Sequence, residues 1–332
     1  MTSEKIASTE ISAPSILPSL LEGLAQEDLP RRSVTLYRLF KGDWSGEDKA
    51  TIVMALLNLL RQPEPPERAA LVMLLAELAR PQPATPGATS SARNQASLRA
   101  ALLTGLPLYT ELAEASEPSV RLHSLYLLSW LFEERARLLP LLLRRLDEEE
   151  EARLRAGLAL TLAQLAGPQP PVRACLLALL KAHEAPITRL GAAMALTRLL
   201  GPESPQRAAR LLVRAIGAPQ AVANDYDALP WARNSVVADS SDLLRLLPRR
   251  RLQFALPVLL EALASASYYE ALSLARTLLY LGFPRPRPEA PFQATTPTQE
   301  AILAALRTSL SAWQASELLG AAAPPSPELS AS

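Results

Sequence analysis

The chain is poor in the residue types that carry most enzymatic and metal chemistry. Its 332 residues include one cysteine, Cys175, and two histidines, His123 and His183. A single cysteine excludes an intrachain disulfide, and its place in the apolar run ACLLALL favours a buried thiol over a nucleophile. Zinc sites use about three or four protein ligands, so we predict no metal and no cofactor.

Aromatic residues make up only 5% of the chain and there are 12 glycines, whereas 49% of the residues are hydrophobic, mainly Leu and Ala. Leu and Ala favour helices, and the residues that favour strands are scarce. Uncharged apolar runs such as TIVMALLNLL reach about half of the ~20 residues that span a bilayer. The N-terminus, MTSEKIASTEISAPS, lacks a signal-peptide pattern. We therefore predict an all-α, soluble, cytoplasmic protein with no membrane partner.

Lysine is nearly absent: 30 of the 34 Lys and Arg residues are arginine. The four lysines are Lys5, Lys41, Lys49 and Lys181. This bias is typical of a GC-rich, bacterial genome, and Arg-specific recognition of phosphate or carboxylate is the alternative. The net charge of +1 disfavours nucleic acid as a partner, since a phosphate-binding face usually raises the total.

Sequence motifs for common chemistry are missing as well. The chain has no HExxH, paired CxxC, GxxxxGK[ST], GxGxxG or GxSxG segment. A Ser–His–Asp arrangement stays open, because such triads are recognised in space rather than in sequence. We predict no catalytic residues and no enzymatic activity.

Apolar residues recur at helical spacing along most of the chain, and the 30 prolines lie mostly at the breaks between these segments. We predict helices over residues 16–26, 30–40, 47–61, 65–79, 95–113, 118–132, 135–146, 149–166, 171–183, 186–200, 205–216, 230–246, 250–265, 267–281 and 298–318. Short connections make consecutive helices antiparallel neighbours. The predicted organisation is a disordered segment 1–14, one helical domain 15–320 and a disordered tail 321–332, with a mobile loop 81–94, an insertion 217–229 and a Pro-rich connector 283–297.

One helical segment recurs along the chain. The copies that begin with arginine read RLHSLYLLSWL from Arg121, RLRAGLALTLAQLAG from Arg153, RLGAAMALTRLLG from Arg189 and RNSVVADSSDLL from Arg233. The pattern resembles that of HEAT-like repeats, whose second helix typically reads acidic-x-x-Val-Arg-x-x-Ala-x-x-Ala-Leu. The good matches cover residues 98–200, and the fourth copy departs from the pattern.

The resemblance implies a right-handed α-solenoid of about seven antiparallel helix pairs with a C-terminal capping helix. It also implies that Arg121, Arg153, Arg189 and Arg233 can join acidic groups in a ladder along the stack. Such a stack presents an extended surface, so we predict a non-enzymatic scaffold or adaptor that binds a protein partner. The alternative is an enzyme or nucleic-acid-binding protein on the same fold, similar to bilin lyases or alkylpurine DNA glycosylases.

The insertion is the most informative departure from the repeat. Its sequence NDYDALPWAR brings together the candidate partner-binding residues Asp225, Tyr226, Asp227, Trp231 and Arg233. Aromatic residues and arginine are enriched at binding hot spots. The competing interpretation is that Trp231 packs into the core and the aspartates cap a helix.

Overall fold

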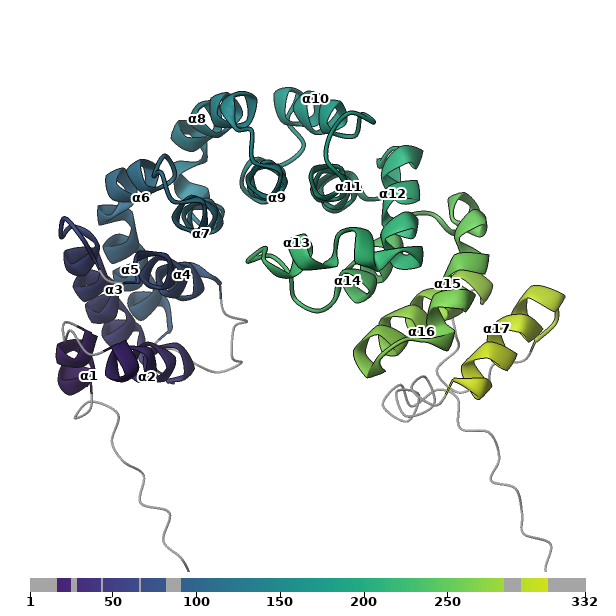
Figure 1. Ribbon diagram of the computed structural model, residues 1–332, viewed down its shortest axis with the longest axis horizontal. Coiled ribbons are helices and arrows are strands. Elements are labelled where there is room, and N and C mark those ends of the chain that lie inside the picture. The colour runs from purple at the N-terminus through teal and green to yellow at the C-terminus, as the bar shows by residue number, and fades with distance from the viewer. Residues whose placement is uncertain are drawn as a thin grey trace, which may run out of the picture. The chain divides into compact units, whose positions relative to one another are not determined.

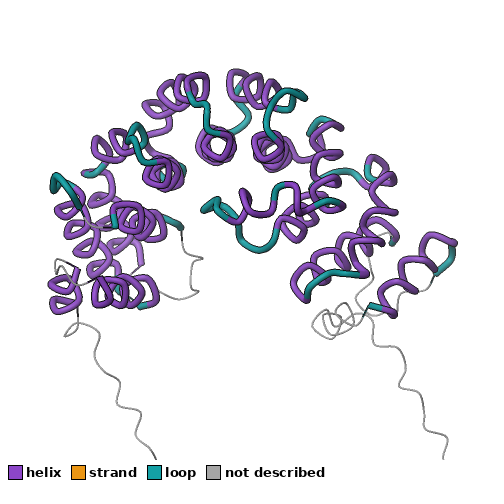
Figure 2. The backbone as a smooth tube through the Cα atoms, viewed as in Figure 1, coloured by secondary structure: helices purple, strands orange, loops and turns teal. Residues whose placement is uncertain are grey.

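The computed structural model describes residues 17–24, 29–42, 44–65, 67–81, 91–283 and 294–309. Every regular element within these ranges is a helix, and no strand occurs in them (Figures 1 and 2). The predicted all-α class is therefore confirmed. The predicted disordered ends 1–14 and 321–332 lie outside the described residues, as do 82–90 of the loop and 284–293 of the connector.

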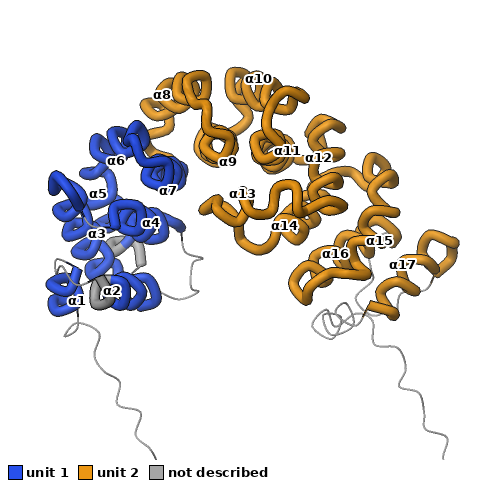
Figure 3. Tube along the Cα trace, in the orientation of Figure 1, with its two compact units in different colours: residues 1–131 blue, residues 132–332 orange. Residues whose placement is uncertain are grey.

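The chain divides into two compact units, residues 1–131 and residues 132–332 (Figure 3). Unit 1 contains α1 (Leu17–Leu24), α2 (Leu29–Lys41), α3 (Gly46–Leu60), α4 (Arg68–Ala79), α5 (Ser91–Thr104), α6 (Leu106–Leu112) and α7 (Pro118–Leu128). Unit 2 contains α8 (Arg135–Glu148), α9 (Ala152–Ala166), α10 (Pro170–Leu179), α11 (Pro186–Leu200), α12 (Gln206–Gly217), α13 (Ala223–Asp227), α14 (Val236–Leu244), α15 (Leu256–Ala264), α16 (Tyr268–Gly282) and α17 (Pro297–Thr308).

Unit 1 is built from helix pairs in two rows. Helix α1 contacts α2, α3 contacts α4, and α6 contacts α7. Along one row α2 contacts α4 and α4 contacts α7, and along the other α1 contacts α3 and α3 contacts α5. The core between the rows is aliphatic and includes the fully buried Leu56, Leu75 and Leu102, with Tyr109 as its largest side chain.

Unit 2 repeats this arrangement with the pairs α8–α9, α10–α11, α12–α14 and α15–α16. Helices α9 and α11 lie side by side, between α8 and α10 on one side and α13 on the other (Figure 1). Helix α14 contacts both α11 and α16, and α17 packs on α15 and α16. Contacts therefore join elements that are close in sequence.

Proline and glycine set the helix boundaries as predicted. Helix α11 begins at Pro186, since proline is favoured in the first turn, and ends before Gly201, whose φ of 49° suits glycine. The predicted helix 95–113 instead splits at Gly105 into α5 and α6, with Pro107 in the first turn of α6. Pro140 remains inside α8.

An arginine occupies the fourth position of three helices, and this corrects the predicted register. These residues are Arg121 in α7, Arg155 in α9 and Arg189 in α11, spaced 34 residues apart along the chain. Arg153, chosen from the sequence, lies two positions earlier, and its Nε is 3.1 Å from Glu151 Oε1. The sequence was ambiguous because arginine occurs at both positions.

Two of these arginines satisfy carbonyl groups just before their own helix. Arg121 Nη1 donates to the carbonyl oxygens of Ala115 and Ser116, each at 2.9 Å. Arg155 Nη1 donates to those of Leu146 at 3.0 Å and Glu149 at 2.9 Å. Leu146 lies in the last turn of α8, whereas Ala115, Ser116 and Glu149 lie in the connections between helices, so each arginine ties the preceding connection to its own helix.

Acidic links also join neighbouring pairs. Arg155 Nη2 donates to Glu184 Oε1 at 2.9 Å, which ties α9 to the turn before α11. In the fourth copy the corresponding position of α14 is occupied by Asp239 rather than by an arginine, and Arg233 precedes that helix. The fourth copy thus departs from the pattern in structure as it does in sequence.

Small residues bring α9 and α11 close together. A Cβ added at Gly191 would lie 2.8 Å from the Cβ and 2.9 Å from the Cα of Ala156. Thr188 Oγ1 donates to the Ala152 carbonyl oxygen at 3.0 Å across the same interface. The segment from Leu190 to Thr197 is buried throughout, so the composition of this stretch serves helix packing.

No helix in the described ranges combines the length and the apolar composition that crossing a membrane requires.

Candidate functional site

The segment 224–233, which begins within the insertion and continues past it, carries all five residues that the sequence singled out, and its helix α13 packs against α14. Tyr226, on α13, is buried, and its hydroxyl donates to Asp239 Oδ2 at 2.6 Å. Burial and the nearby Asp239 charge raise the pKa of Tyr226 well above its ordinary value, so the hydroxyl stays protonated and donates. Trp231 is also buried. These two aromatic residues belong to the core of unit 2.

Asp239 organises the end of the insertion. Its buried carboxylate accepts hydrogen bonds at Oδ2 from the backbone N–H groups of Arg233, at 3.0 Å, and Asn234, at 3.2 Å. The Asn234 side chain donates to Oδ1 at 3.4 Å. A buried carboxylate needs several donors to offset the loss of water, and this loop supplies them. Sequence analysis missed Asp239.

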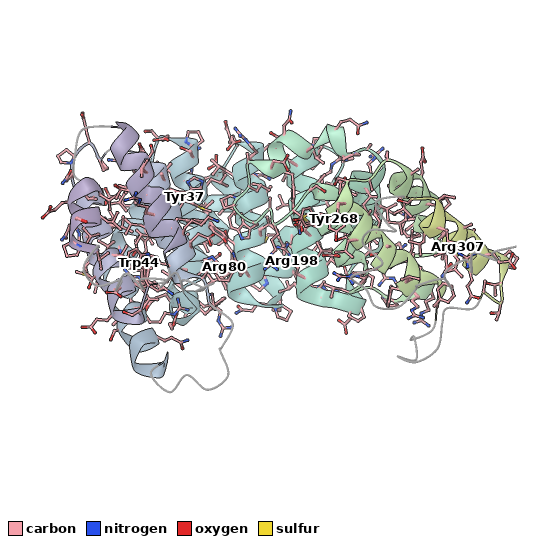
Figure 4. All side chains as sticks on the ribbon, turned by 90° about the horizontal axis from the view of Figure 1, so that it is seen from below. Tyr37, Trp44, Arg80, Arg198, Tyr268 and Arg307 are labelled. Carbon is pink, nitrogen blue, oxygen red and sulfur yellow. The ribbon has the colours of Figure 1, made fainter. Side chains whose placement is uncertain are left out.

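The other three candidates are exposed. Asp225, Asp227 and Arg233 all face solvent, and Asp225 Oδ1 is 3.9 Å from Arg153 Nε on α9. Arg198, on α11 and labelled in Figure 4, also keeps solvent-accessible area. Desolvation by the surrounding protein lowers the pKa of Arg198, and the charge of Arg233 acts in the same direction. The insertion therefore offers a surface of mixed charge.

A larger concave feature lies within unit 1. It is a trough of about 810 Å³ formed where α2 and α4 end and α3 and α5 begin. Its lining residues are Leu39, Phe40, Lys41, Gly42, Trp44, Gly46, Lys49, Leu74, Glu77, Leu78, Ala79, Arg80, Pro81, Gln95, Leu98 and Arg99. Its volume lies within the range of ligand sites in proteins. Figure 4 labels two of these residues, Trp44 and Arg80.

Trp44 is held firmly in the wall of the trough. Its indole N–H donates to the Leu39 carbonyl oxygen at 2.8 Å, which satisfies one of the last carbonyls of α2. Gly42 lies against the ring, because a Cβ added there would be 2.4 Å from Trp44 Cε2. The glycine is therefore required for the position of the aromatic ring.

The described charged groups that line the trough are four cations and one carboxylate. Glu77 accepts a hydrogen bond from the Tyr126 hydroxyl at 3.3 Å and lies 3.6 Å from Arg80 Nη1. Burial, followed by the Glu77 charge, raises the pKa of Tyr126 to about 12, so the hydroxyl keeps its proton. Arg99 donates to the carbonyl oxygens of Ala79 at 3.4 Å and Trp130 at 3.0 Å.

Lys41 and Lys49 complete the charged lining. Neither ammonium group has an ion pair with a described residue, and Lys41 Nζ lies 5.6 Å from the centroid of the Phe40 ring. The trough is thus positively charged and partly aromatic.

An exposed apolar stripe on α2 continues from the trough. It consists of Val34, Tyr37 and Phe40, whose exposed fractions are 52%, 63% and 47%. Residues three apart lie on one helix face, and Phe40 belongs to both the stripe and the trough. Sequence analysis missed this surface. Two of the four lysines flank Trp44 in KGDWSGEDK, and that local clustering was the available indication.

His123 and Cys175, two residue types with catalytic potential, are each partly enclosed by the protein. His123 Nδ1 donates to the Ala69 carbonyl oxygen at 2.8 Å, and burial lowers the pKa of that imidazole. Burial raises the pKa of Cys175 to about 11. Across the described ranges, no group of three or more His, Cys, Asp and Glu side chains is arranged to hold a metal ion. Neither a family model nor a curated protein matches the chain.

Proposed function

We propose that this chain is a HEAT-like repeat protein that acts as a non-enzymatic scaffold or adaptor and binds a protein partner. The observation that carries the proposal is the exposed stripe of Val34, Tyr37 and Phe40 beside the trough. Large apolar side chains that share one exposed face indicate an interaction surface, and aromatic residues dominate the energy of such surfaces.

The helix arrangement supports the repeat assignment. Pairs of helices lie in two rows within each unit. An arginine recurs every 34 residues at the fourth position of α7, α9 and α11. A right-handed solenoid of about seven pairs capped by α17 accounts for both features, since each pair buries its apolar faces against its neighbours. Stacked pairs of this kind present long surfaces to partners.

The stripe also has the physical properties of a partner contact. Tyr37 and Phe40 each offer a rigid ring with few rotatable bonds, so little conformational entropy is lost when they are covered. Phe40 connects this flat face to a concave one. A partner can therefore cover the α2 stripe and enter the trough in one interface.

The insertion supplies a second, polar surface for the same partner. The proposal keeps Asp225, Asp227 and Arg233 as contacts there, because they face solvent. Tyr226 and Trp231 support that surface from the core of unit 2. Exposed charges of this kind steer association more than they add affinity.

Affinity capture from the native lysate tests the proposal. The test variant is Val34→Ser/Tyr37→Ser, which removes two of the three apolar side chains of the stripe and leaves the trough lining, Phe40 included, intact. The matched control is Leu177→Ser/Tyr269→Ser, which removes one exposed aliphatic and one exposed aromatic side chain in unit 2. Helical circular dichroism confirms that both variants fold.

We expect one protein to be retained by the wild type and the control and to be lost from the stripe variant. Retention by all three proteins would contradict the role of the stripe. A further arm, Arg233→Ala, tests the insertion, and the expected result is slower association with little change in dissociation.

A further inference from the structure

We infer that the trough of unit 1 binds an acidic segment of a protein partner, with its carboxylates at Lys41 and Lys49 and an apolar side chain against Trp44 and Phe40. This inference rests on the proposed function and names the chemistry of the partner. It follows from charge, from the distribution of lysine and from the continuity of the trough with the α2 stripe.

Charge complementarity identifies the occupant as an anion. Glu77, the one carboxylate among the described lining residues, is already engaged by Arg80 and by Tyr126, and Arg99 is bonded to two carbonyl oxygens. Lys41 and Lys49 are left with no ion pair among the described residues. Two unpaired ammonium groups beside an apolar wall attract a ligand that carries both negative charge and apolar surface.

The use of lysine is itself unusual in this chain. Lys41, Lys49 and Lys181 are the described lysines, against an arginine majority elsewhere, and two of the three line the trough. An ammonium is a compact charge on a flexible stem, whereas guanidinium demands the planar geometry of a paired carboxylate. A flexible lysine can therefore pair with any one of several carboxylates along an acidic segment.

The stripe favours a polypeptide over a small anion. Val34 and Tyr37 extend from Phe40 along an exposed helix face, where a small ligand would not be enclosed. The chain's own residues 82–90, QPATPGATS, contain no Asp or Glu and do not match the charge of the trough. An acidic segment with spaced apolar residues matches both parts of the surface.

Fluorescence anisotropy on the full chain provides the test. The probe is a fluorescein-labelled peptide of alternating Glu and Leu residues, and the control peptide carries Gln in place of every Glu. The test variant is Lys41→Glu/Lys49→Glu, and the matched control is Lys181→Glu, at an exposed lysine in unit 2. We expect the test variant to weaken binding of the acidic peptide about tenfold or more, and the control to change it less than about twofold.

Two further measurements, the salt dependence of binding and the protection of lysines from acetylation, test the same inference. Affinity for the acidic peptide falls as salt is raised from 50 mM to about 300 mM, because exposed charges are screened. On the wild type, the peptide protects Lys41 and Lys49 from acetylation and leaves Lys181 reactive. This second measurement needs no substitution, so it holds even if the charge-reversal variant fails to fold.

Three results would overturn the inference. These are equal binding of the Glu and Gln peptides, unchanged binding by Lys41→Glu/Lys49→Glu with intact helicity, or displacement of the peptide by inorganic phosphate at a lower concentration than by free acidic peptide. The last would assign the trough to a phosphate-bearing ligand. If stripe-dependent capture from the lysate persists while the acidic peptide does not bind, the proposed function stands and this inference alone fails.

Discussion

Replacement of Gly191 by alanine sets two effects on α11 against each other. In a helix interior alanine is favoured over glycine by about 1 kcal/mol, so helix propensity alone predicts a more stable protein. The new Cβ, however, would lie 2.8 Å from the Cβ and 2.9 Å from the Cα of Ala156. The second of these atoms is backbone, so α9 and α11 must move apart. Overpacking of this kind costs about 1–3 kcal/mol.

We therefore expect Gly191→Ala to lower the free energy of unfolding by up to about 2 kcal/mol, because steric overlap with the backbone exceeds the propensity gain. Urea denaturation of the full chain, followed by circular dichroism, measures the change. Ala156→Gly in the same chain removes the overlap between the two side chains but leaves the overlap with the backbone of residue 156. In a chain that carries Ala156→Gly, Gly191→Ala should therefore lower the free energy of unfolding by a smaller amount than in the wild type, but still lower it. A single Gly191→Ala variant as stable as the wild type, or more stable, would refute the reasoning.

Three further predictions follow from one buried group, Asp239, and two partly buried ones, Cys175 and His123. Asp239→Asn removes the charge that accepts the Tyr226 hydrogen bond, and we expect a loss of about 2 kcal/mol in urea denaturation with faster hydrogen exchange over residues 226–234. Because burial raises the pKa of Cys175 to about 11, iodoacetamide at pH 8 should modify it roughly 100-fold more slowly than in the unfolded chain, by mass spectrometry. Because burial lowers the pKa of His123, the folded chain binds this proton less tightly than the unfolded chain, so stability present above pH ~6.5 should fall with decreasing pH in the wild type but not in His123→Gln.

Much of the secondary structure could be predicted because its determinants are local. The predicted helix 186–200 coincides with α11, where Pro186 marks the start and Gly201 the end. Helix α13 was not predicted, because its five residues have no helical periodicity of their own and are fixed by the bond between Tyr226 and Asp239. Local patterns determine helices, and tertiary contacts determine the short elements between them.

The candidate site was harder to predict from the sequence, because tertiary contacts rather than local patterns place its residues. Tyr226 and Trp231 have the composition of a binding hot spot, but both are buried, and the hydroxyl of Tyr226 is bonded to a carboxylate 13 residues along the chain. Arg153 and Arg155 both fit the repeat pattern, and the position of the helix start distinguishes them. The trough combines four helix termini, so its lining could not be assembled from any single stretch of sequence.

The contacts between elements that are close in sequence have a consequence for how the chain folds. Pairs such as α8–α9, α10–α11 and α15–α16 need only short loops to close before their apolar faces meet. Closing a short loop costs little conformational entropy, so contacts within such a pair can form before contacts between distant segments. Helices at the end of a row have a packed neighbour on one side, so hydrogen exchange should be faster in α17 than in α9 and α11. Within unit 2 we therefore expect local stability to be lower at its last helix than at the helices packed on several sides.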